Sequence, residues 1–330
     1  MKSGKIPNEI LNKIVLSKIN KFRDDVILRP GIGEDCAAID FGKYACVLST
    51  DPITAAVNKV GQLSVHISCN DIASSGVEPI GLLVTILCPV GTSEAELEKV
   101  MEQVCSTASE LNVEIIGGHT EVTPSVNQII ISTTCIGKAQ ANEIVSSSGA
   151  KPGDSVIITK SAGLEGTAII ANDFEHKLAN IISKEDLNYA KNFINSLSVV
   201  KEGVLAGKYG ATSMHDITEG GILGAAWEVA EASGTGIIIN KDNIPVDSVT
   251  NSICEALEIN VLRLISSGCM LITCPDGEGL VKLLESNNIK ATVIGTITAN
   301  ENEKLLISKK EGTVQDIEPP SADELYKLNI

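Results

Sequence analysis

The sequence predicts an α/β fold, and three observations lead to that prediction. Apolar runs of strand length, such as residues 43–50 and 80–88, alternate with longer segments of helical spacing, such as residues 93–111. The apolar fraction of 43% is typical of a well-buried globular chain and excludes a disordered one. Only 3% of the residues are aromatic, so the core must consist mainly of Ile, Val, Leu and Ala.

The predicted elements follow from local spacing and from start and stop residues. A first amphipathic helix opens at Pro7 and Asn8, and a later one opens at Ser93 with an acidic first turn. Helices are expected near residues 6–19, 63–76, 93–111, 166–209, 218–232, 247–257 and 275–287. Strands are expected near residues 43–50, 80–88, 113–116, 128–136, 155–159, 236–240, 270–274 and 291–297.

The stretch from residue 146 to residue 153 is the best candidate for a domain boundary. It is small, polar and glycine-bearing, and it leads into a Lys-Pro-Gly-Asp turn. We therefore predict an N-terminal domain at residues 1–148 and a C-terminal domain at residues 149–330. Both lengths are ordinary for α/β domains.

The segment from Leu63 to Pro79 predicts a buried helix that contains an unexplained charge. Its apolar residues recur at spacings of three and four, and Gly76 and Pro79 are placed to end it. Asn70 and Asp71 lie in its middle, where short polar side chains form helices poorly and are costly to bury. No Lys or Arg lies one turn away from Asp71, so the helix itself cannot neutralise this carboxylate.

The shortage of cations extends over most of the N-terminal half. Between residues 30 and 137 there are thirteen carboxylates, but the only basic residues are Lys43, Lys59 and Lys99. Some of the acids are solvated at the start of a helix, whereas others lie beside apolar runs and glycines, where an unpaired charge is costly. A divalent cation that arrives with a ligand would remove that cost.

Four segments present these acids at or beside the end of an apolar element. They contain Glu34 and Asp35, Asp51, Asn70 and Asp71, and the run His119–Glu121. Oxygen ligands from separate segments are typical of a Mg²⁺ site that water and substrate phosphates complete. The alternative is a set of unrelated caps and turn residues, and the scarcity of basic partners favours the metal site. A lone histidine is more often a hydrogen-bonded structural residue than a ligand or base, so His119 is no more than a candidate.

Two segments of the C-terminal half have the local pattern of an anion site. The run Lys160–Thr167 reads as a strand end, a glycine loop and a helix start, which would point backbone N–H groups at an anion. Many strand–helix joints contain glycine, so this signal is weak by itself. The run His215–Gly221 also places polar groups before a helix, although Thr218 is equally well explained as an N-cap.

Composition and missing motifs exclude several classes of function. The net charge of −16 argues against nucleic acid or an anionic membrane as the main partner. Neither a complete dinucleotide fingerprint nor a P-loop motif is present. The nine cysteines contain no C-x-x-C pair, which indicates a reduced protein without a zinc site. We find no apolar signal segment or membrane-spanning run, so we expect a cytoplasmic protein.

Six motifs occur in the order seen in the AIR synthase-like (PurM-like) ATP-binding superfamily. They are G-E-D-C-A-A-I-D, S-T-D-P-I, N-D-I-A-S-S-G-V-E-P, G-G-H-T-E-V-T-P, K-P-G-D and M-H-D-I-T-E-G-G-I. The resemblance runs from about residue 5 to residue 297, nearly the whole chain. It implies a PurM-like two-domain fold in which the N-terminal domains of a homodimer form a shared β-barrel. It also implies a C-terminal α/β sandwich domain and Mg-ATP held at the dimer interface.

The resemblance further implies roles for individual residues. The metal and phosphate ligands would be Asp35, Asp51, Asp71 and Glu121. The nucleotide site would include Glu34, Asn70, Gly117, Gly118, Gly163, Gly166 and Thr167. The candidate catalytic residues are His119, Lys160 and Asp216. Family members use ATP to phosphorylate a substrate oxygen, usually an amide-like one, because an amide oxygen is otherwise a very poor leaving group.

Within the superfamily the chain most resembles the hydrogenase maturation protein HypE and its AIR synthase-related relatives. After Asp51 it reads P-I-T-A-A-V and lacks the V-E-x-x-H-F of thiamine-monophosphate kinase. HypE proteins carry their substrate on a C-terminal cysteine, whereas the last cysteine here is Cys274. We therefore expect a partner protein or a free small molecule to supply the substrate.

Three functions remain open at this stage. The first is ATP- and Mg²⁺-dependent activation of a carbonyl or amide-type oxygen by phosphorylation, in hydrogenase maturation. The second is a small-molecule kinase of the same fold, similar to thiamine-monophosphate kinase. The third is a nucleotide-binding partner protein without turnover.

Overall fold

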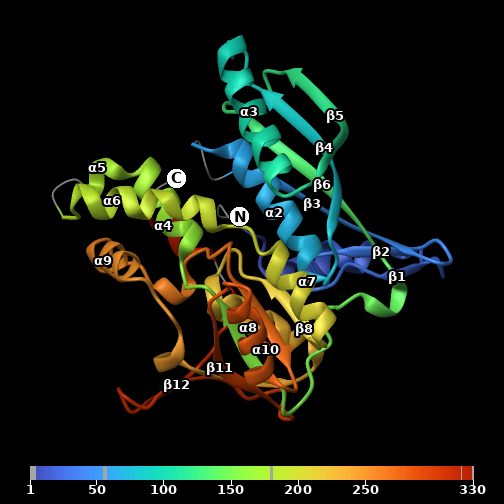
Figure 1. Ribbon diagram of the computed structural model, residues 1–330, viewed down its shortest axis with the longest axis vertical. Coiled ribbons are helices and arrows are strands. Elements are labelled where there is room, and N and C mark those ends of the chain that lie inside the picture. The colour runs from blue at the N-terminus through green and yellow to red at the C-terminus, as the bar shows by residue number, and fades with distance from the viewer. Residues whose placement is uncertain (1–4, 55–57, 179–180, 321, 329–330) are drawn as a thin grey trace.

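Two β-sheets, each with its own helices, organise the chain in the computed structural model (Figure 1). The structure describes residues 5–54, 58–178, 181–320 and 322–328. The first sheet belongs to the N-terminal half and the second to the C-terminal half, and the helix α2 lies where the two halves meet. This mixed α/β architecture confirms the predicted fold class.

The N-terminal sheet has six strands in the order β1-β2-β3-β6-β4-β5. Their bounds are β1 Val26–Leu28, β2 Ala37–Asp40, β3 Ala45–Ile53, β4 Pro79–Cys88, β5 Glu114–Val122 and β6 Ile130–Ala139. All neighbouring pairs are antiparallel except β4 and β5, which are parallel. Because β5 is last in the strand order, it is an edge strand. Short helices at Asn8–Ile14 (α1) and Leu16–Lys18 (η1) precede the sheet.

Two helices cover one face of this sheet, and both agree with the prediction. The helix α2, Val60–Ser74, is buried along its whole length, and Gly76 ends it with a positive φ of 74°. The helix α3, Glu94–Glu110, begins with a capping box in which Ser93 and Glu96 satisfy each other's backbone N–H groups. These signals are local in sequence, which is why the sequence was sufficient to predict them.

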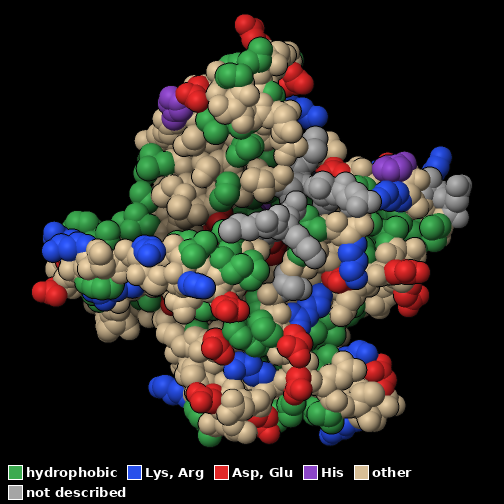
Figure 2. All heavy atoms as spheres, turned by 180° about the vertical axis from the view of Figure 1, so that it is seen from behind, with side chains coloured by type: hydrophobic (Ala, Val, Ile, Leu, Met, Phe, Trp, Pro, Cys, Tyr) green, Lys and Arg blue, Asp and Glu red, His purple; other side chains and the backbone are tan. Residues whose placement is uncertain are grey.

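The opposite face of the N-terminal sheet has no helix over it among the described residues. On this side lie apolar residues such as Ile80, Leu83 and Ile116, which are 49%, 40% and 50% exposed. Seen from behind, the surface of the N-terminal half shows several hydrophobic side chains (Figure 2). An uncovered sheet face usually carries polar side chains, so an apolar one indicates an interface.

The C-terminal sheet has seven strands in the order β13-β12-β9-β11-β7-β10-β8. The strands are β7 Ser155–Thr159, β8 Ser213–Asp216, β9 Gly236–Asn240, β10 Met270–Cys274, β11 Ala291–Thr298, β12 Lys304–Ser308 and β13 Thr313–Asp316. The helices are α4 Leu164–Asp173, α5 Glu175–Leu178, α6 Lys184–Lys191, α7 Val200–Tyr209, α8 Gly221–Ser233, α9 Ser248–Ala256 and α10 Gly277–Ser286.

Helices pack on both faces of the C-terminal sheet. Val156 and Ile158 of β7 point into a core shared with α4 and α8, whereas Ile157 points into a core shared with α7 and α10. This alternation places the sheet between two helical layers and produces the predicted α/β sandwich. No helix among the described residues is long and apolar enough to cross a membrane.

The structure corrects several predicted element bounds. The strand β3 continues through Asp51 to Ile53 instead of ending at Asp51. The run from Gly117 to Glu121, which follows the strand predicted at residues 113–116, belongs to β5 as well. A side chain at Gly118 would collide with the Val84 backbone of β4, so glycine is needed for this close pairing.

The structure also differs from the prediction at elements whose sequence signals are weak. The strands β1, β2, β12 and β13 were not predicted, because each is short or lacks a long apolar run. The region predicted as helical from residue 166 begins earlier, at Leu164, and is divided among several helices. Part of the P-I-T-A-A-V stretch that separates this chain from thiamine-monophosphate kinase, at residues 55–57, lies outside the described residues.

Candidate active site

A pocket of about 570 Å³ lies at the junction of the two halves and takes its walls from both. The N-terminal half contributes the loop before β2, the end of β3 and one side of α2. The C-terminal half contributes the start of α4, the residues around the end of β8 and the segment 265–267. A pocket of this size can hold a nucleotide-sized ligand.

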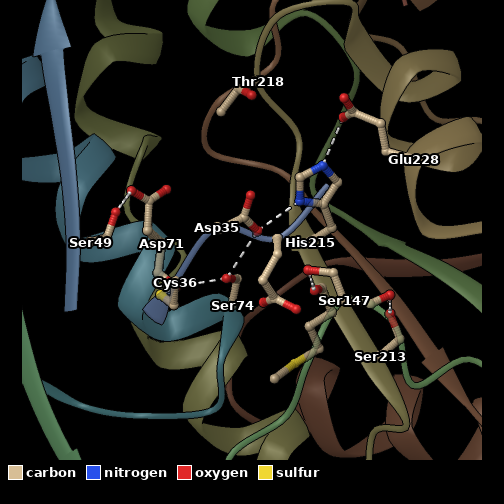
Figure 3. Close-up of polar contacts among 12 residues, drawn as sticks. Asp35, Cys36, Ser49, Asp71, Ser74, Ser147, Ser213, His215, Thr218 and Glu228 are labelled. Carbon is tan, nitrogen blue, oxygen red and sulfur yellow. Dashed lines mark hydrogen bonds and ion pairs between the residues drawn. The ribbon is translucent and has the colours of Figure 1, made fainter. Parts of the chain in front are cut away.

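Four aspartates converge on this pocket from separate segments. Asp35 precedes β2, Asp51 lies in β3, Asp71 lies in α2, and Asp216 ends β8. Asp71 and Asp216 are 4% and 0% exposed. Ser49 donates a hydrogen bond to Asp71 (Figure 3), whereas neither carboxylate oxygen of Asp216 has a hydrogen-bond partner among the described residues.

Burial and the charges of neighbouring acids raise the pKa values of Asp71, Asp216 and Glu34. Burial, and then the charges of Asp216 and Asp51, hold the pKa of Asp71 well above its ordinary value. Burial and the charge of Asp35 raise the pKa of Asp216 to about 8. Glu34, at the edge of the cluster, has its pKa raised to about 7, mainly by burial. Carboxyl groups that resist ionisation in this way form a site that a cation would stabilise.

His215 connects the aspartate cluster to a buried glutamate (Figure 3). Its Nδ1 lies 2.7 Å from an oxygen of Asp35, and its Nε2 lies 3.1 Å from an oxygen of Glu228. Burial alone would lower the pKa of the imidazole, but the contacts with Asp35 and Glu228 outweigh burial and hold it well above its ordinary value. A ring that donates from both nitrogens has no lone pair for a metal, so His215 orients Asp35.

The donor set of the cluster fits Mg²⁺. Candidate ligand atoms of Asp35 and Asp216 lie within 4.8 Å of each other. The unpartnered oxygens of Asp216 need a donor or a cation, because a buried carboxylate without either is strongly destabilising. The four aspartates offer only carboxylate oxygens, which suit a hard cation whose remaining ligands are water and phosphate. The residues that could hold it are Asp35, Asp51, Asp71 and Asp216.

The structure does not bring the Gly117–Glu121 run to this pocket within one chain. These residues lie in the edge strand β5, where all of them are exposed. His119 Nε2 lies 3.1 Å from Glu121 Oε2, in a hydrogen bond on the surface. Glu121, a predicted metal ligand, is therefore separate from the four aspartates, as are Gly117, Gly118 and His119.

Asn70 has a different position from the predicted one in the nucleotide site. Its Nδ2 donates to the carbonyl of Leu197 at 2.8 Å, and its Oδ1 accepts from the N–H of Val199 at 2.9 Å. Both ends of the amide are thus used to attach α2 to the chain before α7. Asn70 is fully buried and joins the two halves of the molecule.

The ammonium group of Lys160 also makes its contacts inside the protein. Its ammonium donates to the carbonyls of Ser198 and Gly268 at 2.5 and 2.8 Å and forms an ion pair with Glu202 at 2.7 Å. Two carbonyls and one carboxylate thus surround the ammonium inside the protein. The structure therefore gives Lys160 a structural role, in contrast to the predicted catalytic one.

We expect the substitution Lys160→Met to lower the free energy of unfolding by about 3 kcal/mol, because it leaves the carboxylate of Glu202 buried and unpaired. Chemical denaturation measures this loss. Lys241→Met is the control: it breaks the exposed ion pair with Glu311, which we expect to cost less than about 1 kcal/mol. A loss of nucleotide affinity without a loss of stability in Lys160→Met would contradict the structural role.

The glycine loop before α4 is closed by internal hydrogen bonds. The N–H groups of Gly163 and Gly166 donate to the segment 265–266 at 2.8 and 3.0 Å. The hydroxyl of Thr167 donates to Thr250 at 3.0 Å. Gly163 and Gly166 thus do not offer their N–H groups to an anion, in contrast to the prediction for this loop.

The sequence prediction gave no individual role to several residues of the site, namely His215, Glu228, Glu165, Ser267 and Lys5. Two of them carry the signal that singled out Asp71. Glu165 and Glu228 both lie in apolar helices with no Lys or Arg one turn away. His215 adjoins Asp216 in the sequence, but its local sequence does not indicate the contact with Asp35. His215 and Asp35 are 180 positions apart, and spacing patterns cover only a few residues.

Together the fold and the pocket define a mixed α/β protein with an acid-lined pocket at the junction of its two halves. Two family models match most of the chain. The N-terminal domain of AIR synthase related proteins matches residues 33–139, and the C-terminal domain of these proteins matches residues 151–308. The chain belongs to the AIR synthase-related family.

Individual proteins show which members of the family this chain resembles. A hydrogenase expression/formation protein of Methanocaldococcus jannaschii is 29% identical over 98% of this chain and 97% of its own length. The carbamoyl dehydratase HypE of Cupriavidus necator is 24% identical over 92% of this chain and 88% of its own. A solved structure of HypE in complex with ATP has a TM-score of 0.73 at 20% identity, covers 98% of both chains, and shows that the fold is shared.

Proposed function

We propose that this chain is an ATP- and Mg²⁺-dependent enzyme that activates an amide-type oxygen by phosphorylation during hydrogenase maturation. The observation that carries the proposal is the meeting of Asp35, Asp51, Asp71 and Asp216 in one pocket, where the pKa values of Asp71 and Asp216 are raised and neither oxygen of Asp216 has a hydrogen-bond partner among the described residues. The names of the relatives, a hydrogenase formation protein and a carbamoyl dehydratase, support the reaction class. The substrate is carried by a partner protein or is a free small molecule.

Different residues of the pocket would bind the cation, position its ligands and contact the nucleotide. The four aspartates would hold Mg²⁺, which when bound neutralises negative charge on the phosphates. His215, held in turn by Glu228, keeps Asp35 in place. Apolar side chains, including Ile53 and Ile67, line the other part of the pocket and suit the uncharged part of a nucleotide. Positioning and electrostatics are the protein's contribution to this chemistry.

We further propose that the chain acts as a homodimer of two-domain subunits, with the domains at residues 1–148 and 149–330. The uncovered apolar face of the N-terminal sheet would form the shared barrel. The pocket continues onto this face through Leu48, Thr50 and Thr134. The run Gly117–Glu121 of one subunit would then lie near the pocket of the other, where His119 and Glu121 could meet the nucleotide.

Thermal denaturation with and without Mg²⁺ and ATP tests the proposed function. Glu34 and Asp216 have pKa values raised to about 7 and about 8, so stability that is present at low pH is lost as the pH rises through these values. A bound cation offsets this loss. We therefore expect Mg²⁺ and ATP to raise the melting temperature more at about pH 8 than at about pH 6.

The same samples are assayed for Mg²⁺-dependent release of phosphate from ATP. Release above a metal-free control supports an enzyme. Binding without any release, also in the presence of carbamoylated cysteine peptides, would indicate a nucleotide-binding protein without turnover. The absence of a Mg²⁺- and ATP-dependent shift at both pH values would contradict the proposed site itself.

A further inference from the structure

Lys5 is the only basic residue among the described residues that line the pocket, where every other charged side chain is an acid. Its ammonium donates a hydrogen bond at 3.1 Å to the hydroxyl of Thr218, which lies just after β8 and is labelled in Figure 3. Asp216, two positions before Thr218, has no hydrogen-bond partner for either carboxylate oxygen among the described residues. The ammonium of Lys5 therefore lies in the part of the pocket where negative charge lacks a partner.

The charge of this ammonium and the charges of the acids around it act on one another. Burial alone would lower the pKa of Lys5, but the charges of neighbouring acids, led by Glu228 and Asp35, outweigh burial and raise it. Burial and the charge of Asp35 raise the pKa of Asp216, whereas the charges of His215 and Lys5 lower it. Lys5 is thus an internal counter-ion of the aspartate cluster.

Contacts with two other segments hold the backbone of Lys5 at the pocket. The N–H of Lys5 donates to Oε2 of Glu219 at 2.9 Å, and Oε1 of Glu219 accepts from the hydroxyl of Tyr326 at 3.0 Å. Tyr326 lies in the 3₁₀-helix η6, Glu324–Leu328, which packs into the core through the buried side chain of Leu325. The backbone of Lys5 is thus held in place, whereas its four-carbon side chain is flexible.

An ammonium in this place has opposite effects on a metal ion and on a nucleotide. A divalent cation bound to the same aspartates would add a like charge near Lys5, and this repulsion would weaken the binding of the metal by itself. The phosphates of a nucleotide would give the ammonium an anionic partner, because lysine binds phosphate as a point charge. Lys5 would therefore disfavour the free metal and favour the metal that arrives with a nucleotide.

We propose that Lys5 is a tethered counter-ion of the aspartate cluster, which opposes the binding of a divalent cation alone and pairs with nucleotide phosphates when they are present. This inference rests on the proposed function and adds an order of binding to it, in which the metal and the nucleotide enter the pocket together. The alternative is that Lys5 only attaches the N-terminal segment to Glu219. That contact uses the backbone N–H, so a substitution of the side chain leaves it in place.

Two titrations of the wild type and of Lys5→Met test the inference. The first uses Mn²⁺ alone, because Mn²⁺ takes the same oxygen ligands as Mg²⁺ and electron paramagnetic resonance measures its free concentration. The second is a calorimetric titration with a non-hydrolysable ATP analogue in excess Mg²⁺. We expect Lys5→Met to bind Mn²⁺ at least about threefold more tightly than the wild type, and the analogue at least about tenfold more weakly.

Two further variants assign these effects to the charge of Lys5. Lys5→Arg keeps the positive charge, so we expect both of its affinities to stay within about twofold of the wild type. Lys13→Met removes an equal charge from an exposed position of α1 outside the pocket and is the matched control. It should leave both affinities unchanged. A melting curve in chelator establishes that each variant is folded before it is titrated.

Three outcomes would overturn the inference: Mn²⁺ binding in Lys5→Met that is no tighter than in Lys13→Met, analogue binding in Lys5→Met that is no weaker than in Lys13→Met, or a Lys5→Arg variant that behaves like Lys5→Met. The wild type separates this inference from the proposed function. Failure of the wild type to bind both Mn²⁺ and the analogue contradicts the proposed function. Normal binding by the wild type, with Lys5→Met equal to Lys13→Met, contradicts only the role of Lys5.

Discussion

Asp71→Asn is expected to lower kcat/KM for Mg²⁺-dependent ATP turnover by about a hundredfold or more, because it removes one of the four carboxylates that could hold the cation. Asparagine keeps the size of the side chain and can still accept the hydrogen bond from Ser49. The change therefore removes charge with little change in packing. Steady-state kinetics with varied Mg²⁺ and ATP measure the effect.

The same substitution is expected to stabilise the protein when a chelator is present. In the absence of a cation, Asp71 is buried among Asp35, Asp51 and Asp216, which oppose its ionisation. A neutral asparagine removes this repulsion, so we expect the free energy of unfolding to rise by about 1 kcal/mol or more near pH 8. Opposite signs for stability and turnover are typical of a functional residue, since a purely structural residue would lose both.

Asp24→Asn is the control for this experiment, because Asp24 is exposed and outside the pocket. It should change neither turnover nor stability. If Asp71→Asn left both nucleotide affinity and turnover at wild-type values, the metal site proposed for the four aspartates would be wrong. If it lowered stability in chelator, the electrostatic account of the cluster would be wrong.

Ile116→Glu is expected to convert the proposed homodimer to monomers and to reduce ATP turnover about a hundredfold or more. Ile116 lies in β5 and is half exposed on the uncovered face, beside Gly81 of β4. A carboxylate there would be buried without a partner if two such faces packed together. Turnover would fall with the dimer, since the run Gly117–Glu121 is expected to reach the pocket only across the interface.

Sedimentation velocity at several protein concentrations measures this effect together with the turnover of each species. Val314→Glu is the matched control, because Val314 is an exposed apolar residue of β13 in the other half of the molecule. We expect it to leave both the molecular mass and the turnover unchanged. A wild-type chain that sediments as a monomer and still turns over ATP would refute the shared barrel and the roles of His119 and Glu121.

Local signals in the sequence were sufficient to predict most helices and strands of the N-terminal half. The helix α2 is buried as predicted and stops just before Gly76, although it begins three residues earlier, at Val60, and the capping box of α3 has the predicted Ser93. Both predictions depend on residues within a few positions of one another. The strand β5 was predicted incompletely, because its continuation through Gly117 and Gly118 depends on close pairing with β4, which sequence spacing does not report.

The candidate site was predicted in part for the same reason. Asp35, Asp51 and Asp71 each carry a local signal, an acid at or within an apolar element that has no nearby cation. The structure brings these three to one pocket with Asp216. Lys160 also has a local pattern that predicts an anion site, a lysine before a glycine loop. Its ammonium instead contacts Glu202 and donates to two backbone carbonyls.

The sequence by itself determined the α/β class, the family, most helices and strands, and the surplus of acids in the N-terminal half. Only the tertiary structure decided which charged groups meet. The packing of β8 against the loop before β2 joins His215 to Asp35, and the docking of α4 buries Glu165 in the wall of the same pocket. Periodicity and caps act over a few residues, whereas the pairing of buried charges depends on contacts between segments far apart in the chain.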